Sequence, residues 1–139
     1  MDIDEINVRA VMSTDVRTVT RNEPLSVPDS LMSKEGIRHL PVLSDDGELC
    51  GIITQRDLFR GALLRALGYG SRAEEHMLSK LVVKEAMTEE PLTISPDIPL
   101  RDAARQMIEH KVGCLPVVEG GKLVGILTEG DFARFVSQA

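Results

Sequence analysis

The chain has 139 residues, a length that suits one compact domain or two small halves that share a core. Hydrophobic residues make up 42% of the chain and charged residues 27%, as in globular proteins, whereas the aromatic share of 3% predicts an aliphatic core. The formal net charge of −6 argues against nucleic acid as a partner, because non-specific binding to nucleic acid needs a basic face. A small anionic ligand is still compatible with this charge, since a pocket can be locally basic.

The segment 1–10 is acidic and contains no apolar stretch of the kind found in signal peptides. No apolar run further along the chain approaches the length of a membrane span. We therefore expect a cytoplasmic protein without a membrane partner. Both cysteines, Cys50 and Cys114, stand in apolar runs, which favours buried small side chains over a disulfide framework.

The first half of the chain predicts a strand, a helix, two further strands and a second helix. Residues 16–20 are rich in β-branched side chains and predict the first short strand. A helical stretch follows, and then two apolar runs, at 39–43 and ending at Thr54, predict a pair of strands. The turn at 45–47 between them is of the kind that closes a hairpin. A helix is predicted to begin directly after Thr54.

The second half repeats this order. Residues 92–94 predict a short strand, and the apolar spacing over 99–110 predicts an amphipathic helix. The apolar run at 114–118, the glycine turn at 119–121 and a strand that ends at Thr128 complete the copy, followed by a last helix. The sequence therefore predicts an α+β fold made of tandem, pseudo-symmetric β-α-β-β-α repeats.

The two halves also match residue by residue. Met12 and Met87 stand 75 residues apart, and the Leu-Pro-Val runs at 40–42 and 115–117 keep the same spacing. After one residue is dropped in the turn, the spacing becomes 74. Matches spread over a whole unit, with one slip at a turn, indicate a true internal repeat. We predict repeats at 8–67 and 83–137, joined by a helical linker at 68–82.

The linker is longer than a simple connector. Gly68-Tyr-Gly70 predicts a break, and Ser71 with Glu74 has the spacing of a capping box, which opens a further helix. This helix has two interpretations, a lid or partner-binding element and a packed connection, of which we favour the packed connection.

Each repeat ends in a Thr-x-x-Asp pattern, at 54–57 and at 128–131. On a structural interpretation, the hydroxyl caps a helix and the acid stabilises its positive end. On a functional interpretation, the outward N–H groups form a site for an anion, and the Asp accepts hydrogen bonds from the vicinal hydroxyls of a ribose. Gly51 and Gly125, just upstream, permit the close approach of a backbone or a ring.

The doubled pattern, with Leu-Pro-Val in the middle of each copy and Gly-x-x-Thr-x-x-Asp near its end, resembles a pair of CBS domains (cystathionine β-synthase domains), also called a Bateman module. The resemblance spans about residues 8–136, and both copies carry it. Since this leaves no room for a catalytic or DNA-binding domain, we expect a stand-alone pair.

The resemblance implies an adenosine-containing ligand, namely AMP, ADP or ATP, with S-adenosylmethionine or a dinucleotide such as NAD as alternatives. In the family, the acid of Thr-x-x-Asp holds the ribose and the Thr reaches ribose or phosphate. The adenine contacts the first strand and the residues before the Pro-Val run, often those of the opposite copy. Carried over to this sequence, one pocket would combine Thr54, Asp57, Leu92, Thr93, Val112 and Gly113. The other would combine Thr128, Asp131, Arg17, Thr18, Ile37 and Arg38.

The two copies differ in charge, which predicts unequal pockets. Arg38 and His39 stand where the second copy has Gly113 and Cys114, and an arginine at position 56 stands where the second copy has a glycine. Arg38 is the first candidate for binding phosphate, because a guanidinium suits phosphate oxygens, and His39 is the second. The alternative for Arg38 is an ordinary surface arginine.

We expect neither a metal site nor an enzyme. The three histidines, at positions 39, 76 and 110, show no metal-ligand spacing, and neither cysteine stands on a turn or helix start that would activate it. No nucleophile with a base and no phosphate-binding P-loop can be argued from the sequence. No cofactor is therefore required.

The resemblance implies a regulatory module that senses an adenine nucleotide and acts on a protein partner, which the sequence does not identify. The alternative is a ligand-free structural module for dimerisation or interaction. A homodimer is expected on either interpretation, because the resemblance implies pairing through helices. Candidate contact residues are Leu58, Phe59, Leu63, Leu64, Phe132, Phe135 and Val136.

Overall fold

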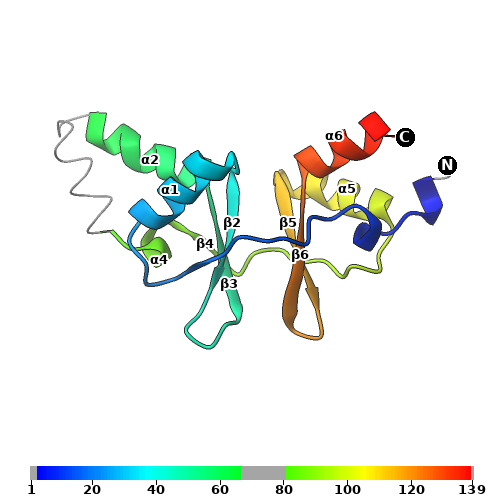
Figure 1. Ribbon diagram of the computed structural model, residues 1–139, viewed down its shortest axis with the longest axis horizontal. Helices are drawn as coiled ribbons and strands as arrows, with labels where there is room; N and C mark the ends of the chain where they lie inside the picture. The colour runs from blue at the N-terminus through cyan, green and yellow to red at the C-terminus, as the bar shows by residue number, and fades with distance from the viewer. Residues whose placement is uncertain (1–2, 67–80, 139) are drawn as a thin grey trace. The chain divides into compact units, whose positions relative to one another are not determined.

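The computed structural model describes residues 3–66 and 81–138, with the side chains of 61–66 outside the description (Figure 1). The chain divides into two compact units. Unit 1 consists of residues 1–16 together with 91–139, and unit 2 consists of residues 17–90. The linker helix predicted at 68–82 lies almost entirely outside the described residues.

Unit 2 is a four-stranded sheet with helices α1 and α2 lying next to each other (Figure 1). The sheet has the order β1-β2-β3-β4, in which β1 runs parallel to β2 and the other neighbours are antiparallel. The elements are β1 (Val19–Thr20), α1 (Ser26–Glu35), β2 (His39–Leu43), β3 (Leu49–Thr54), α2 (Gln55–Ala66), α4 (Val83–Ala86) and β4 (Thr88–Glu89).

The core of unit 2 is aliphatic, as the composition predicts. The central strands β2 and β3 contribute side chains that are fully shielded from solvent, and α1 and α2 cover them. Burial of such side chains removes apolar surface from water, at roughly 25 cal/mol per Å². The buried members of this cluster are Val19, Leu25, Met32, Leu40, Val42, Ile53, Leu58 and Val83.

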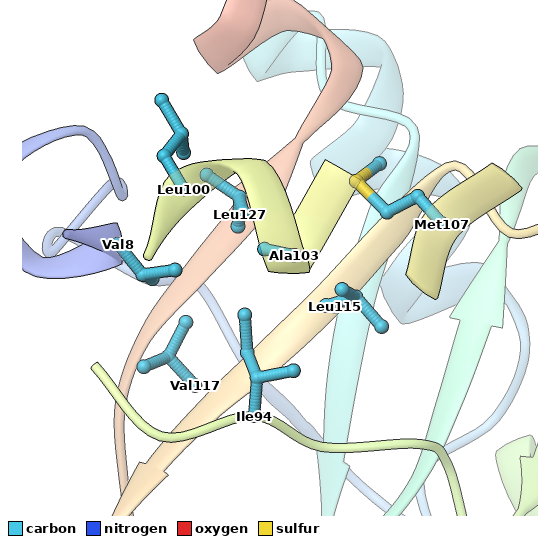
Figure 2. Close-up of a cluster of buried hydrophobic side chains, with 8 residues drawn as sticks. All are labelled: Val8, Ile94, Leu100, Ala103, Met107, Leu115, Val117 and Leu127. Atoms are coloured by element: carbon cyan, nitrogen blue, oxygen red, sulfur yellow. The ribbon is translucent and has the colours of Figure 1, made fainter. Parts of the chain in front are cut away.

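Unit 1 combines the N-terminal segment with the second half of the chain. Its strands β5 and β6 form an antiparallel pair, and α5 packs its apolar face on them. Figure 2 shows Leu100, Ala103 and Met107 of α5 above Leu115 and Val117 of β5. The elements are η1 (Ile3–Glu5), η2 (Val8–Ala10), α5 (Leu100–His110), β5 (Cys114–Glu119), β6 (Lys122–Thr128) and α6 (Glu129–Gln138).

The predicted α+β fold with two β-α-β-β-α repeats is confirmed, although the first strand is short in both copies. The strand predicted at 16–20 is reduced to the two residues of β1. The strand predicted at 92–94 is reduced to one parallel bridge between Ile94 and Val117. Residues 96 and 116 would have to donate the next bonds of this parallel ladder, and both are prolines, so the pairing cannot extend in either direction.

The hairpin of β5 and β6 shows why its turn is rich in glycine. Glu119 pairs with Lys122, which leaves a two-residue loop. Gly120 and Gly121 both have positive φ, at 58° and 79°, as a type I′ turn requires. The glycines therefore allow a tight connection that keeps the register of the two strands.

The compact units do not follow the two sequence repeats, because each unit takes in the segment that begins the other repeat. We call these the exchanged segments, residues 8–16 in unit 1 and 83–90 in unit 2. In unit 1, the backbone of Ser13 exchanges two hydrogen bonds of 2.9 Å with Ile126 of β6. In unit 2, β4 pairs with β3, so that Thr88 lies opposite Ile52. Ser13 and Thr88 are equivalent positions of the repeat, so that each unit pairs with the other repeat's segment in the same way.

Surface ion pairs also hold the N-terminal segment to the rest of unit 1. Arg9 contacts both Asp97 and Glu119, and Arg101 contacts Asp4 at 2.6 Å. All these side chains are about half exposed, so that each pair contributes little on its own. The buried Val8 is the stronger attachment, since it is fully shielded within the cluster of Figure 2.

The close approach expected at Gly51 and Gly125 is made by the chain itself. A Cβ at Gly51 would lie 2.5 Å from the sulfur of Met87 and 2.9 Å from the carbonyl oxygen of Thr88. A Cβ at Gly125 would lie 2.6 Å from the sulfur of Met12. Only glycine lets the exchanged segment lie this close to the strand. Among the described residues, no helix is long and apolar enough to cross a membrane.

We predict that Gly125→Ala destabilises the protein, because the added methyl group must displace the Met12 side chain and the Ser13 backbone. Overpacking of this kind costs about 1–3 kcal/mol in the free energy of unfolding. Urea unfolding measures the effect as a lower midpoint. The control is Gly130→Ala in α6, where the nearest atom would be 3.5 Å away and alanine favours the helix. Equal midpoints for Gly125→Ala and the wild type would contradict the packing described here.

Candidate functional site

The first Thr-x-x-Asp pattern lies where β3 passes directly into α2, and we call residues 54–57 the first corner. The backbone N–H of Thr54 donates to Oδ2 of Asp57 at 2.8 Å, and the N–H of Asp57 donates to Oγ1 of Thr54 at 3.2 Å. These reciprocal bonds form a capping box and use two N–H groups that a helix start leaves without partners. The structural interpretation of the pattern is therefore confirmed here.

The second corner, residues 128–131, lies where β6 passes into α6 and has the same capping box. The N–H of Thr128 donates to Oδ2 of Asp131 at 2.9 Å, and the N–H of Asp131 donates to Oγ1 of Thr128 at 3.3 Å. In both corners, Oδ2 of the aspartate thus accepts from the backbone, and Oδ1 is the oxygen that the capping box leaves unused.

The two corners differ at this second oxygen. Oδ1 of Asp131 accepts a hydrogen bond of 2.7 Å from the hydroxyl of Ser13 and a further bond of 2.5 Å from the guanidinium of Arg134. The Asp131 side chain is only 2% exposed. Leaving a buried oxygen without its donors costs about 1–3 kcal/mol, and more for a charged group. A ligand hydroxyl would have to replace these partners.

Asp57 is more accessible than Asp131. Its side chain is half-buried, and within the described part of the chain no donor bonds its Oδ1. The residue equivalent to Arg134 is Arg60, which is exposed and forms no ion pair with Asp57. Asp57 can therefore accept a hydrogen bond from a ligand without giving up one within the protein.

Positive charge lies beside the first corner. The N–H of Gln55 donates to the carbonyl oxygen of Arg38 at 2.8 Å, and His39 lies opposite Thr54 in the β2–β3 register. The Arg38 side chain is exposed. This brings a guanidinium and an imidazole, both predicted from the sequence to bind phosphate, into the same unit as Asp57.

Neutral residues hold the same places beside the second corner. The N–H of Glu129 donates to the carbonyl oxygen of Gly113 at 3.2 Å, and Cys114 lies opposite Thr128 in the β5–β6 register. The charge difference between the copies, read from the sequence, thus falls at matching positions of the two corners.

The remaining predicted site residues are distributed over both units. Arg17 donates to Glu35 at 3.0 Å, Thr18 is half-buried, and Ile37 packs against the core of unit 2. In unit 1, Leu92 and Thr93 are exposed, whereas Val112 packs against the core. Each predicted pocket draws on residues from both units, and these two combinations stay predictions of the sequence.

Ser13 and Arg134 were not predicted to belong to a site. Ser13 precedes its own repeat's first strand, and nothing in the sequence places it beside Asp131. The signal that could have found Arg134 is its position three residues after Asp131, since side chains at this spacing are neighbours on a helix. The same spacing holds for Arg60 and Asp57, however, so that spacing alone does not predict which pair forms.

The apolar helical residues predicted for a dimer contact divide into two groups. Leu58 belongs to the core of unit 2, and Phe132 and Phe135 pack against the core of unit 1. Phe59 and Val136 are exposed, at 64% and 70%. Among the described side chains of this set, Phe59 and Val136 are the most available for a contact with another molecule, and the dimer contact stays a prediction. The side chains of Leu63 and Leu64 lie outside the described residues.

Neither cysteine has the properties of a nucleophile. Burial raises the pKa of the Cys114 thiol to about 12, with a smaller contribution from the negative charge of Glu129. Burial also raises the pKa of Cys50. Both thiols are free. Within the described residues, no three acidic, histidine or cysteine side chains come together as a metal site would require.

Unit 2 has a surface pocket of about 380 Å³, and none of its lining residues is among those predicted to bind a ligand. It combines basic and acidic side chains with one thiol and one thioether. Its lining residues are Arg21, Cys50, Lys84, Met87, Glu89 and Glu90.

Comparison with known proteins agrees with this architecture. A sequence model of the CBS domain matches residues 8–63 and 83–138, which confirms the resemblance to a CBS pair. The CBS domain-containing protein YhcV of Bacillus subtilis is 32% identical over 91% of this chain and 83% of its own length. Homoserine O-acetyltransferase of Methanococcoides burtonii is 32% identical over 94% of this chain, which spans only 24% of that enzyme.

Two solved structures contain ligands. CBSX2 in complex with AMP is 31% identical, with a TM-score of 0.76 over 95% of this chain and 96% of its own. The CBS domain pair of protein MJ0100, in complex with 5-methylthioadenosine and S-adenosyl-L-methionine, is 27% identical, with a TM-score of 0.78 over 96% of this chain and 97% of its own.

We predict that Cys114 is unreactive toward a thiol reagent in the folded protein. With a pKa of about 12, only about one thiol in ten thousand is ionised at pH 8, and the thiolate is the reactive form. Titration of the Cys50→Ser variant with Ellman's reagent should show almost no reaction in buffer and one equivalent in urea. Rapid reaction of this variant without denaturant would contradict the burial of Cys114.

Proposed function

Because the chain belongs to the CBS domain family, we propose that it is a regulatory module that binds an adenosine-containing ligand, and that it is not an enzyme. The observation that carries this proposal is the ligand chemistry of its structural neighbours. The CBS structure of 31% identity holds AMP, and the one of 27% identity holds 5-methylthioadenosine and S-adenosyl-L-methionine. These three ligands share an adenosine group.

The first corner supports this proposal by its chemistry. Oδ1 of Asp57 can accept a hydrogen bond from a ribose hydroxyl, while Oδ2 stays in the capping box. The positive end of α2, which starts at Gln55, favours negative charge nearby. Arg38 adds a guanidinium that can pair with phosphate oxygens. We therefore assign ribose to Asp57 and phosphate to Arg38.

The ligand class follows from these groups. AMP, ADP and ATP offer both a ribose and a phosphate, and S-adenosylmethionine and NAD are the alternatives that share the adenosine group. Regulation requires that the ligand bind two conformations of the protein with different affinity, since only differential affinity shifts an equilibrium. We propose that this shift is transmitted to a protein partner, and that a cytoplasmic homodimer is the sensing form.

A ligand-free association module is the second candidate. The exposed apolar side chains of Phe59 and Val136 favour it, because large apolar side chains at a helix surface stabilise contacts between molecules. Tight self-association together with no melting shift by any adenosine compound would favour this candidate over ligand sensing.

We predict that an adenosine compound stabilises the wild-type protein and that Asp57→Asn reduces this stabilisation, because it raises the Kd. A ligand that binds only the folded state stabilises by about 2.7 kcal/mol at one hundred times its Kd. Thermal unfolding with AMP, ADP, ATP, NAD and S-adenosylmethionine measures this stabilisation. The matched control is Asp46→Asn, an exposed acid in the hairpin turn of the same unit. Full stabilisation of Asp57→Asn would refute the assigned role of Asp57.

We predict that Arg38→Ala weakens the binding of ADP more than it weakens the binding of adenosine, because only ADP offers phosphate oxygens to the guanidinium. Loss of a charge-assisted pair of about 1.5–3 kcal/mol corresponds to roughly a ten- to hundredfold increase in Kd. Calorimetric titration measures, for each compound, the ratio of the variant's Kd to that of the wild type. The control is Lys34→Ala, which replaces an exposed basic residue of α1. Equal weakening of ADP and adenosine would show that Arg38 does not bind phosphate.

A further inference from the structure

The two corners have the same sequence pattern and the same capping box, but they differ in what bonds the outer carboxylate oxygen. Oδ1 of Asp131 accepts hydrogen bonds from Ser13 and Arg134, and the side chain is buried. In the described part of unit 2, neither Thr88 nor Arg60, which hold the equivalent positions, bonds Asp57. The second corner is therefore closed by the protein's own side chains, and the first corner is open.

One residue explains why the arginine closes only the second corner. Gly130 lies between Thr128 and Arg134, and a Cβ placed on it would be 3.6 Å from the guanidinium. This is an ordinary contact distance, so that alanine would fit here, but a longer side chain would compete with Arg134 for the space beside Asp131. The first corner has Arg56 at this position, four residues before Arg60 on α2. Like charges at this spacing repel each other, which disfavours the approach of Arg60.

The Ser13 hydroxyl reaches Asp131 for a different reason than the Arg134 guanidinium does. Ser13 is held in place by its two backbone hydrogen bonds to Ile126, so that its Oγ lies 2.7 Å from Asp131. Thr88 has the corresponding backbone position in β4, opposite Ile52, but it is exposed and does not bond Asp57. The donors at the second corner are thus supplied by two segments that meet only in the folded unit.

We propose that the chain has one ribose-binding corner, at Asp57, and that Ser13, Gly130 and Arg134 determine this by closing the corner at Asp131. This inference rests on the proposed function, because it assigns the stoichiometry of the same ligand. Asp131 is then a structural residue that fastens the N-terminal segment to the start of α6. The unequal charges beside the corners agree with this assignment, since Arg38 stands beside the open corner and Gly113 beside the closed one.

Calorimetric titration of the wild type with AMP, and separately with S-adenosylmethionine, should give one equivalent per chain. Asp57→Asn should reduce the affinity by at least about tenfold, as loss of one hydrogen bond to a charged group implies. Asp131→Asn should leave the Kd within about twofold of the wild type. Since Asp131→Asn can also destabilise unit 1, Arg134→Ala provides a second variant, because the Arg134 side chain is 63% exposed and its removal leaves no cavity.

A gain of binding is the sharper test. The double variant Ser13→Ala with Arg134→Ala removes both donors from Oδ1 of Asp131 and should bind a second equivalent. Gly130→Arg reproduces the first corner and should act in the same direction. In the reverse exchange, Arg56→Gly allows Arg60 to approach Asp57 and should weaken the single site, whereas Arg56→Lys keeps the bulk and charge and should not.

The outcomes separate this inference from the proposed function. A wild type that binds neither compound overturns the proposed function and the single-site assignment with it. A wild type that binds two equivalents, or an Asp131→Asn variant that is folded by circular dichroism but has lost binding, overturns only the inference. A double variant that still binds one equivalent overturns the assignment of closure to Ser13 and Arg134.

Discussion

The contact between each exchanged segment and a strand glycine determines the rest of this structure. At Gly51 and Gly125, a methionine sulfur and a backbone carbonyl oxygen lie only 2.5–3.0 Å from where a β-carbon would be. This close approach lets the segment pair with the strand, and in unit 1 the pairing holds Ser13 beside Asp131. The state of the second corner therefore depends on a glycine three residues before its threonine.

The same local pattern has two different consequences in this chain. In both corners, Thr-x-x-Asp forms a capping box that fixes the start of a helix. The capping box uses one oxygen of each aspartate, and the surrounding residues determine whether the other oxygen has a hydrogen-bond donor. At Asp57 that oxygen faces no protein donor within the described residues, whereas at Asp131 it is fully engaged. A motif of this kind therefore identifies a possible ligand corner but not its availability.

Local features of the fold were accessible from the sequence. The hairpin turns, the amphipathic helix α5 and the strand-to-helix corners follow from residue spacing and turn chemistry, and all three are present. The repeat and the resemblance to a CBS pair were also correctly predicted. The first strand of each copy was overestimated, and in the second copy β-branched composition does not reveal that Pro96 and Pro116 prevent pairing beyond Ile94. Sequence spacing carries local information, and it succeeded where local rules decide the structure.

Contacts between distant segments were not accessible in this way. The exchange of segments between the repeats, and with it the bond from Ser13 to Asp131, joins residues that are far apart along the chain. The packing of Leu58, Phe132 and Phe135 within their own units was missed for a related reason, since an apolar helix face does not state which surface covers it. The choice between Arg60 and Arg134 as a partner for aspartate depends on the free space over Gly130, which appears only in three dimensions.

The exchange of segments also sets an order in which the chain can fold during synthesis. Unit 2 is continuous, from residue 17 to residue 90, and all of its contacts can form once that stretch has left the ribosome. Unit 1 needs residues 1–16 and 91–139 together, so that its first segment must wait for the last strand pair to be translated. A folded unit 2 holds the two ends of the intervening chain at a fixed separation, which reduces the loop entropy lost when unit 1 closes. During synthesis, unit 1 can therefore be completed only after residues 91–139 have followed, and its early segment, with the apolar Val8, has no native partner in unit 1 until then.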